Sequence, residues 1–161
     1  MTRHRIRKRL LAAAAMMALA TASVAPAADR GAALYAEHCA VCHDTAGAGV
    51  PGFAPPLAGP VAARVKTPGG REYVAAVVVH GISGVFESGG QRQFGAMTPA
   101  PALPDGDLAA ILNHVLGTFN AGALPAEFPP YATADIAAAR KAALTPAQLH
   151  QTKAALERAA R

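Results

Sequence analysis

The sequence predicts a mainly α-helical fold made of short helices joined by loops. Residues 105–119 carry the strongest helical signal, because their apolar side chains recur at intervals of three and four positions. The alternation typical of β-strands is nearly absent, and glycines and prolines divide the rest of the chain into short segments. The chain has no tryptophan and only 5% aromatic residues. Such a chain needs a large apolar group to fill its core.

Residues 1–28 are expected to be a secretory signal peptide. A basic stretch over residues 3–9 precedes the apolar run Leu10–Ala20, and a tract of small residues with alanine-based cleavage options follows. The apolar run is too short to span a bilayer comfortably, so we favour a cleaved signal over an uncleaved membrane anchor. The arginines lack the pairing of a twin-arginine signal, which indicates the Sec route. Export by this route predicts a protein of the periplasm.

The charge balance of the chain depends on this signal segment. The formal net charge is +5, from 15 basic and 10 acidic residues. Five of the basic residues lie within residues 1–28, so the rest of the chain carries ten charges of each sign. A neutral mature chain gives no reason to expect nucleic acid as a partner.

Residues 29–120 are expected to form one helical domain. A first helix spans residues 29–39, with Asp29 as its N-cap. A loop rich in glycine and proline follows over residues 44–60. A second helix spans residues 71–80 and ends before a glycine.

The rest of this domain is expected to be a loop and a long helix. Within residues 82–104, the pairs 85–86 and 93–94 flank a Ser-Gly-Gly turn, which predicts a small hairpin. The helix over residues 105–119 then carries one continuous apolar stripe. Its members are Leu108, Ile111, Leu112, Val115, Leu116 and Phe119.

Residues 121–161 are expected to be a C-terminal helical extension rather than a second domain. Prolines punctuate this tail, and Thr145 and Pro146 begin its last helix. Gln148 completes a capping box with Thr145.

Cys39, Cys42 and His43 form the most informative motif, in the pattern C-x-x-C-H. A redox disulfide normally follows a strand and opens a helix in an alternating β/α chain, which this sequence is not. A structural zinc site needs four ligands, and no second ligand pair exists, so no zinc is expected. The pattern is the attachment signature of a c-type haem, with two thioethers and an axial imidazole. One covalent haem c also supplies the missing apolar group of the core.

Met97 is expected to be the second axial ligand of the iron. It is the only methionine outside the signal segment and lies in an irregular loop with no helical stripe for it to join. Filling of the core is the alternative role. His80 is the rival ligand, although a structural role is the default for a histidine that ends an apolar helix. A thioether favours ferrous iron and raises the reduction potential relative to a second imidazole.

With these motifs, residues 29–120 resemble a bacterial monohaem class I cytochrome c. In that family a glycine and an aromatic residue four positions apart on the first helix cross the last helix, and Gly31 and Tyr35 match them. The resemblance implies that Pro55, twelve positions after His43, places its carbonyl on the free N–H of that imidazole.

The segment that ends at Met97 resembles that of cytochromes which serve periplasmic dehydrogenases and terminal oxidases or reductases. The resemblance therefore implies redox partners of these kinds, in the periplasm or in the membrane. The chain departs from the family pattern at three positions. Phe94 replaces a frequent tyrosine, Thr98 replaces a frequent proline, and His114 replaces a frequent aromatic residue.

We therefore predict a periplasmic one-electron carrier, or an electron-transfer subunit of an oxidoreductase complex, and not an enzyme. An iron with both axial positions filled has no vacant position for a substrate. The alternative is a haem protein with a labile distal ligand that acts as a peroxidase or as a sensor of small gases.

Overall fold

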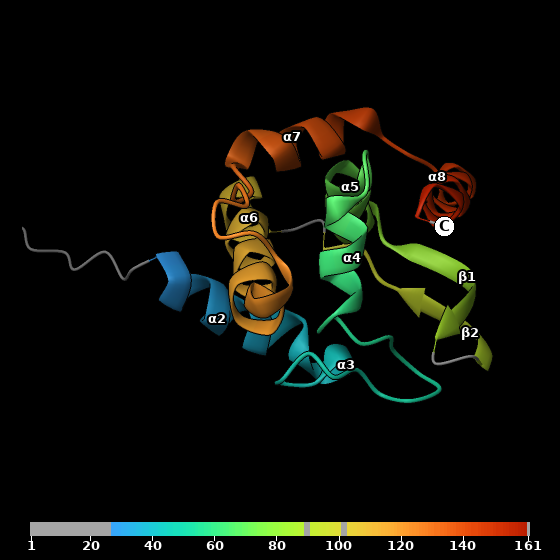
Figure 1. Cartoon of the computed structure of the whole chain (residues 1–161), viewed down its shortest axis with the longest axis horizontal. Coiled ribbons are helices and arrows are strands. Elements are labelled where there is room, and N and C mark those ends of the chain that lie inside the picture. The colour runs from blue at the N-terminus through green and yellow to red at the C-terminus, as the bar shows by residue number, and fades with distance from the viewer. Residues whose placement is uncertain (1–26, 89–90, 101–102, 161) are drawn as a thin grey trace, which may run out of the picture.

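The computed structural model describes residues 27–88, 91–100 and 103–160 (Figure 1). The predicted signal peptide lies outside these residues, apart from Ala27 and Ala28, which begin the first described helix. Within the described ranges no helix is both long enough and apolar enough to cross a membrane. The helices and strands are α2 (Ala27–His38), α3 (Ala40–His43), α4 (Pro60–Lys66), α5 (Gly70–His80), β1 (Ile82–Ser88), β2 (Gln91–Met97), α6 (Asp105–His114), η1 (Val115–Phe119), η2 (Ala121–Ala123), α7 (Thr133–Ala142) and α8 (Pro146–Ala159).

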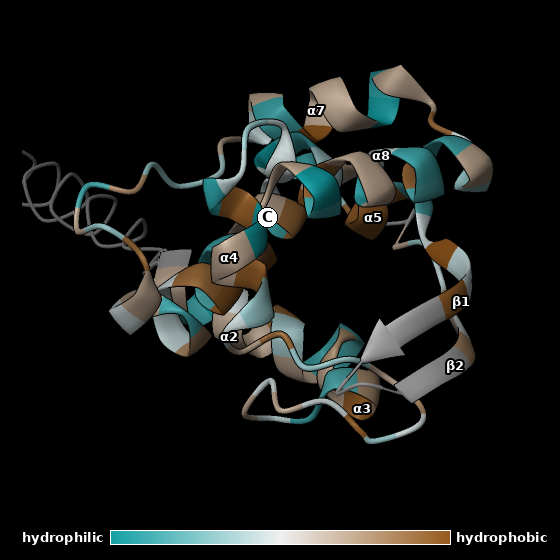
Figure 2. Ribbon diagram, turned by 45° about the vertical axis from the view of Figure 1, so that its right-hand side comes forward, coloured by the Kyte–Doolittle hydropathy of each residue, from teal (hydrophilic) through white to brown (hydrophobic). Residues whose placement is uncertain are grey.

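The core lies between the crossing of α2 with α6 and the packing of α5 against α4, α7 and α8 (Figure 1). Figure 2 shows apolar segments on α4 and α5, and alternating polar and apolar segments along α7 and α8. Four side chains of the core are almost fully buried: Tyr35, Leu108, Ile136 and Leu149. Two of these four belong to the C-terminal tail, so the tail shares the core of residues 29–120.

Several predicted elements are confirmed. The helix expected over residues 71–80 is α5, and the expected hairpin is the antiparallel pair β1–β2. Val85 pairs with Phe94 in this hairpin, while two residues of its turn lie outside the described ranges. The predicted apolar stripe of residues 105–119 faces the core, where its first five members are buried.

Other expectations need correction. Asp29 lies within the first turn of α2 and is not its N-cap, because the helix begins at Ala27. Helix α4 was not predicted, because its short sequence follows a loop rich in proline and glycine. Met97 ends strand β2 and is paired with Ile82, so it does not lie in an irregular loop.

The long helix expected over residues 105–119 divides into α6 and a π-helical turn, η1. The side chain of Asn120 explains where this helix ends. Its amide donates to the carbonyl of Val115 at 2.9 Å. This carbonyl is thus satisfied by a side chain instead of by the backbone N–H of a further helical turn.

The tail packs against α5 through both of its helices. The capping box predicted at the start of α8 is present, with the Thr145 N–H donating to Gln148 Oε1 at 2.8 Å and the Gln148 N–H donating to Thr145 Oγ1 at 3.3 Å. Leu149 and Leu156, one helical face of α8, are buried in the core. The extension is thus an integral layer of the molecule.

Candidate functional site

Cys39, Cys42 and His43 lie on a single helical turn. The N–H groups of Cys42 and His43 both donate to the carbonyl of Cys39, at 3.1 and 3.0 Å. This turn is helix α3, with Cys39 as its N-cap, and the loop predicted from residue 44 follows it directly. Both cysteines are free and half-buried, and His43 is buried. The turn therefore presents two thiols and one imidazole from adjacent positions, the set that a c-type haem requires.

A hydrogen bond fixes the tautomer of His43. The ring nitrogen Nδ1 lies 3.0 Å from the carbonyl oxygen of Pro55. A carbonyl can only accept, so Nδ1 carries the proton and Nε2 keeps its lone pair. Burial lowers the pKa of His43, and the hydrogen bond to Pro55 opposes this effect. The result is a neutral imidazole with one nitrogen available to a metal.

The loop after the motif is held in a defined shape. The Tyr35 hydroxyl donates to the carbonyl of Asp44 at 2.7 Å, directly after His43. The N–H of Gly49 donates to the His43 carbonyl at 2.9 Å, and the N–H of Leu57 donates to the Gly47 carbonyl at 2.8 Å. These bonds return the chain to the motif and bring the Pro55 carbonyl to the imidazole.

The thiol of Cys39 is not activated for redox chemistry. Burial, with a smaller contribution from Cys42, raises its pKa to about 11. A reactive Cys-x-x-Cys pair needs a thiolate of lowered pKa. At neutral pH this thiol is uncharged, which favours a structural or covalently attached role over a redox disulfide.

Met97 is half-buried and packs against the core, as do several other apolar side chains that are only half-buried. Three valines of α5 share one face of that helix, since they are three and four positions apart. The group comprises Leu57, Val61, Val74, Val77, Val78, Ala100 and Leu103. These incompletely covered apolar side chains, together with the thiols, the imidazole and the thioether, fit a haem.

Two further histidines, His80 and His114, contact other parts of the protein. Nε2 of His80 donates to the carbonyl of Ala139 at 2.9 Å, which agrees with the structural role expected for it. The ring of His114 lies 5.4 Å from that of Tyr35 and 5.1 Å from that of Phe119, so an imidazole makes the interhelix ring contact. Within the described ranges, no three His, Cys, Asp or Glu side chains are grouped so that they could hold a metal ion.

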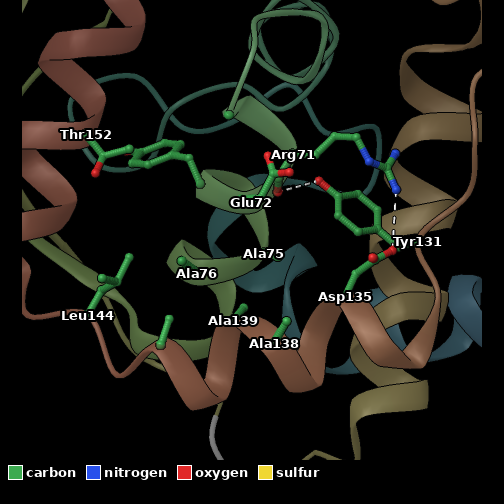
Figure 3. Close-up of a pocket in the computed structure, with 13 residues that line it drawn as sticks. Arg71, Glu72, Ala75, Ala76, Tyr131, Asp135, Ala138, Ala139, Leu144 and Thr152 are labelled. Carbon is green, nitrogen blue, oxygen red and sulfur yellow. Dashed lines mark hydrogen bonds and ion pairs between the residues drawn. The ribbon is translucent and has the colours of Figure 1, made fainter.

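A cavity of about 370 Å³ lies between α5, α7 and α8 (Figure 3). Alanines of α5 and α7 form much of its wall. At one end, the Tyr131 hydroxyl donates to the carbonyl of Arg71 at 2.9 Å, and the guanidinium of Arg71 pairs with Asp135 at 3.5 Å (Figure 3). The cavity is lined by neither the C-x-x-C-H turn nor Met97, so it marks incomplete packing of the tail on α5.

Asn120 is a residue that the sequence reasoning missed. Its side chain is 2% exposed and accepts from the N–H groups of Gly59 and Ala62, at 2.8 and 3.2 Å. It thereby joins the end of η1 to the start of α4, which follows the loop of Pro55. No local pattern marks it, because its partners are about sixty positions away in the sequence.

Comparison with known proteins gives one family and two relatives. The family described as Cytochrome c matches residues 28–119, a range that includes the motif, Pro55 and Met97. A cytochrome c-552 of Thermus thermophilus is 38% identical over 119 residues, which cover 74% of this chain and 90% of the relative. A second cytochrome c-552 of the same species is also 38% identical over 119 residues, which cover 80% of its length. The whole tail, residues 121–161, lies beyond the family match.

Proposed function

Since the chain belongs to the cytochrome c family, as a class I protein with covalently bound haem c that transfers electrons, we propose that it is a periplasmic one-electron carrier with a single haem. In this proposal Cys39 and Cys42 would hold the haem through two thioethers, and His43 and Met97 would ligate its iron. The haem supplies reversible exchange of one electron between its ferric and ferrous states. The contact of His43 with Pro55 carries the proposal.

His43 is prepared for its role before any metal is bound. Its Nδ1–H is directed to the Pro55 carbonyl, so the ring is oriented and Nε2 is the free donor. This outer hydrogen bond makes the imidazole a stronger donor in both oxidation states. The same bond would hold the ring of His43 in one orientation when it binds the iron.

Met97 supports the proposal through its place in the fold. It ends a strand whose partner, β1, follows α5 directly, and the N–H of Ala100, three residues on, donates to the carbonyl of Val78 in that helix. A thioether at the second axial position would leave no site for a substrate and would raise the reduction potential. This arrangement suits a carrier and opposes peroxidase or gas-binding activity.

Partner docking would use the side of the molecule that carries the motif. Val41, between the two cysteines, is 79% exposed, and Phe53 in the following loop is 63% exposed. Exposed apolar side chains on the attachment turn and in the loop that follows it suit the small, short-lived interfaces of redox partners. We propose periplasmic dehydrogenases as donors and terminal oxidases or reductases as acceptors.

The carrier function is tested by Met97→Ala, with His80→Ala as the matched control. We expect Met97→Ala to change the ferric absorption spectrum and lower the reduction potential, whereas His80→Ala leaves both as in the wild type. Unchanged properties in Met97→Ala would refute the axial role of Met97. Rapid uptake of carbon monoxide by the untreated ferrous wild type would instead favour a gas-binding function.

A further inference from the structure

The backbone around Met97 is tied to the end of α5. Met97 pairs with Ile82 at the base of the hairpin, and the N–H of Ala100 donates to the carbonyl of Val78 at 3.1 Å. The position of Met97 therefore depends on how firmly the segments before and after it are held.

His150 of helix α8 holds the segment before Met97. Its Nε2 lies 2.6 Å from the Ser83 carbonyl in β1, and it must donate because the carbonyl can only accept. The imidazole also fills the space beside Gly84, where an added Cβ would come within 2.9 Å of two of its ring atoms. Ser83 pairs with Ala96, the residue next to Met97. His150 thus restrains the hairpin one residue pair away from the thioether.

Helix α7 holds the chain on the other side of this region. Nη2 of Arg140 donates to the Leu103 carbonyl at 3.2 Å, and the same guanidinium pairs with Asp105 at 2.8 Å. The neighbouring carbonyl of Ala139 accepts from His80. Helix α7 therefore contacts the chain where it leaves α5 and where it enters α6.

We propose that α7 and α8 form a positioning clamp for Met97, with His150 and Arg140 as its positioning residues. This inference rests on the proposed role of Met97 as an iron ligand. An incoming ligand can replace the thioether only if the Met97 segment moves away. Contacts that restrain β1 and residues 103–105 oppose this movement, so the clamp favours the closed site.

The clamp is tested in the full-length, haem-loaded ferric protein with imidazole as the competing ligand. The loss of the methionine–iron charge-transfer band measures the displacement of Met97. His150→Ala removes the donor to Ser83, and we expect its affinity for imidazole to rise about fivefold, the effect of losing one hydrogen bond. His150→Gln keeps an N–H donor at a similar reach and should restore the wild-type affinity.

Two controls separate the clamp from general loosening of the tail. Glu157→Gln weakens the contact of α8 with Arg64 of α4 but leaves β1 untouched, and we expect wild-type imidazole affinity. Arg140→Met should raise the affinity, whereas Arg158→Met, the same change at an exposed position of α8, should not. Arg140→Met also provides the test if His150→Ala does not fold.

Three results would overturn the inference. Wild-type affinity in both His150→Ala and Arg140→Met would show that these contacts do not restrain Met97. An equal rise in imidazole affinity in Glu157→Gln would show that loosening α8 at any point has the same effect. Absence of the charge-transfer band in the wild type would overturn the proposed ligation itself, and with it this inference, so the two failures are distinguishable.

Discussion

A methyl group at Gly31 would overlap the carbonyl oxygen of Ala110, because helices α2 and α6 are in contact at this pair. Only a glycine permits this approach, since any Cβ would meet the backbone of the opposite helix. The two residues thereby fix the crossing of the first and last helices of the domain.

Gly31→Ala is therefore expected to destabilise the folded protein. The added methyl group must push the two helices apart, at a cost of about 1–3 kcal/mol in the free energy of unfolding. Chemical denaturation of the holoprotein measures this loss. Gly117→Ala is the control, because no atom of the described residues lies within 4 Å of the added Cβ at that exposed position, apart from the chain neighbours and the backbone of its own helix. Equal stability of the two variants would contradict the close approach.

Tyr35→Phe should loosen the turn that follows His43. The variant loses the hydrogen bond from the hydroxyl to the Asp44 carbonyl, and we expect a loss of about 1 kcal/mol in unfolding free energy. Tyr73→Phe is the control, since the Tyr73 hydroxyl makes no hydrogen bond to the residues that the structure describes. The result is measured by denaturation of both variants beside the wild type.

The ion pair of Arg30 with Asp107 should make stability depend on pH. Two hydrogen bonds of 2.7 and 2.8 Å join the groups, and the guanidinium holds the pKa of the Asp107 carboxyl below its ordinary value. A carboxyl with a lowered folded-state pKa stabilises the protein above its unfolded-state pKa, and this contribution is lost as the pH falls through the folded value.

We therefore expect Asp107→Asn to be less stable than the wild type at pH 7. The difference in denaturation midpoint should stay constant down to about pH 5 and shrink below about pH 4, where the wild-type carboxyl begins to protonate. High salt should also reduce the difference in midpoint between Asp107→Asn and the wild type, because the ion pair is partly exposed. A difference that grows on acidification would contradict the lowered pKa.

Asn120→Ala should cause the largest loss of stability in this series. The substitution removes two acceptor contacts, to the N–H groups of Gly59 and Ala62, and two donor contacts, to the carbonyls of Leu57 and Val115. Buried backbone groups without partners cost free energy, so we expect a loss of about 2–4 kcal/mol. Thermal and chemical denaturation measure it. A loss below about 0.5 kcal/mol would place Asn120 among ordinary surface positions.

Single substitutions of the cysteines test covalent attachment. In Cys39→Ser or Cys42→Ser one vinyl group of the haem remains unsaturated, so the ferrous absorption band should shift to longer wavelength. In the double variant the haem should be extracted by acidified solvent, whereas it stays with the wild-type chain. Extraction from the wild type would contradict attachment through thioethers.

The sequence predicted the features that depend on neighbours in the chain. The pattern C-x-x-C-H identified a covalent haem, and the family match confirms this cofactor and the mainly α-helical fold. Helix α5, the β1–β2 hairpin and the capping box of Thr145 were predicted for the same reason, since their signals span a few residues. The axial role of Met97 stays a prediction, although its position at the end of β2 supports it.

The sequence by itself determined the attachment turn, because positions three and four apart on a helix share one side whatever the rest of the chain does. Only the tertiary structure decided which distant groups complete the site. Asn120 meets Gly59, and His150 meets Ser83, across about sixty residues or more. Such contacts follow from the packing of whole helices, and a single polar residue carries no local pattern that announces its partner.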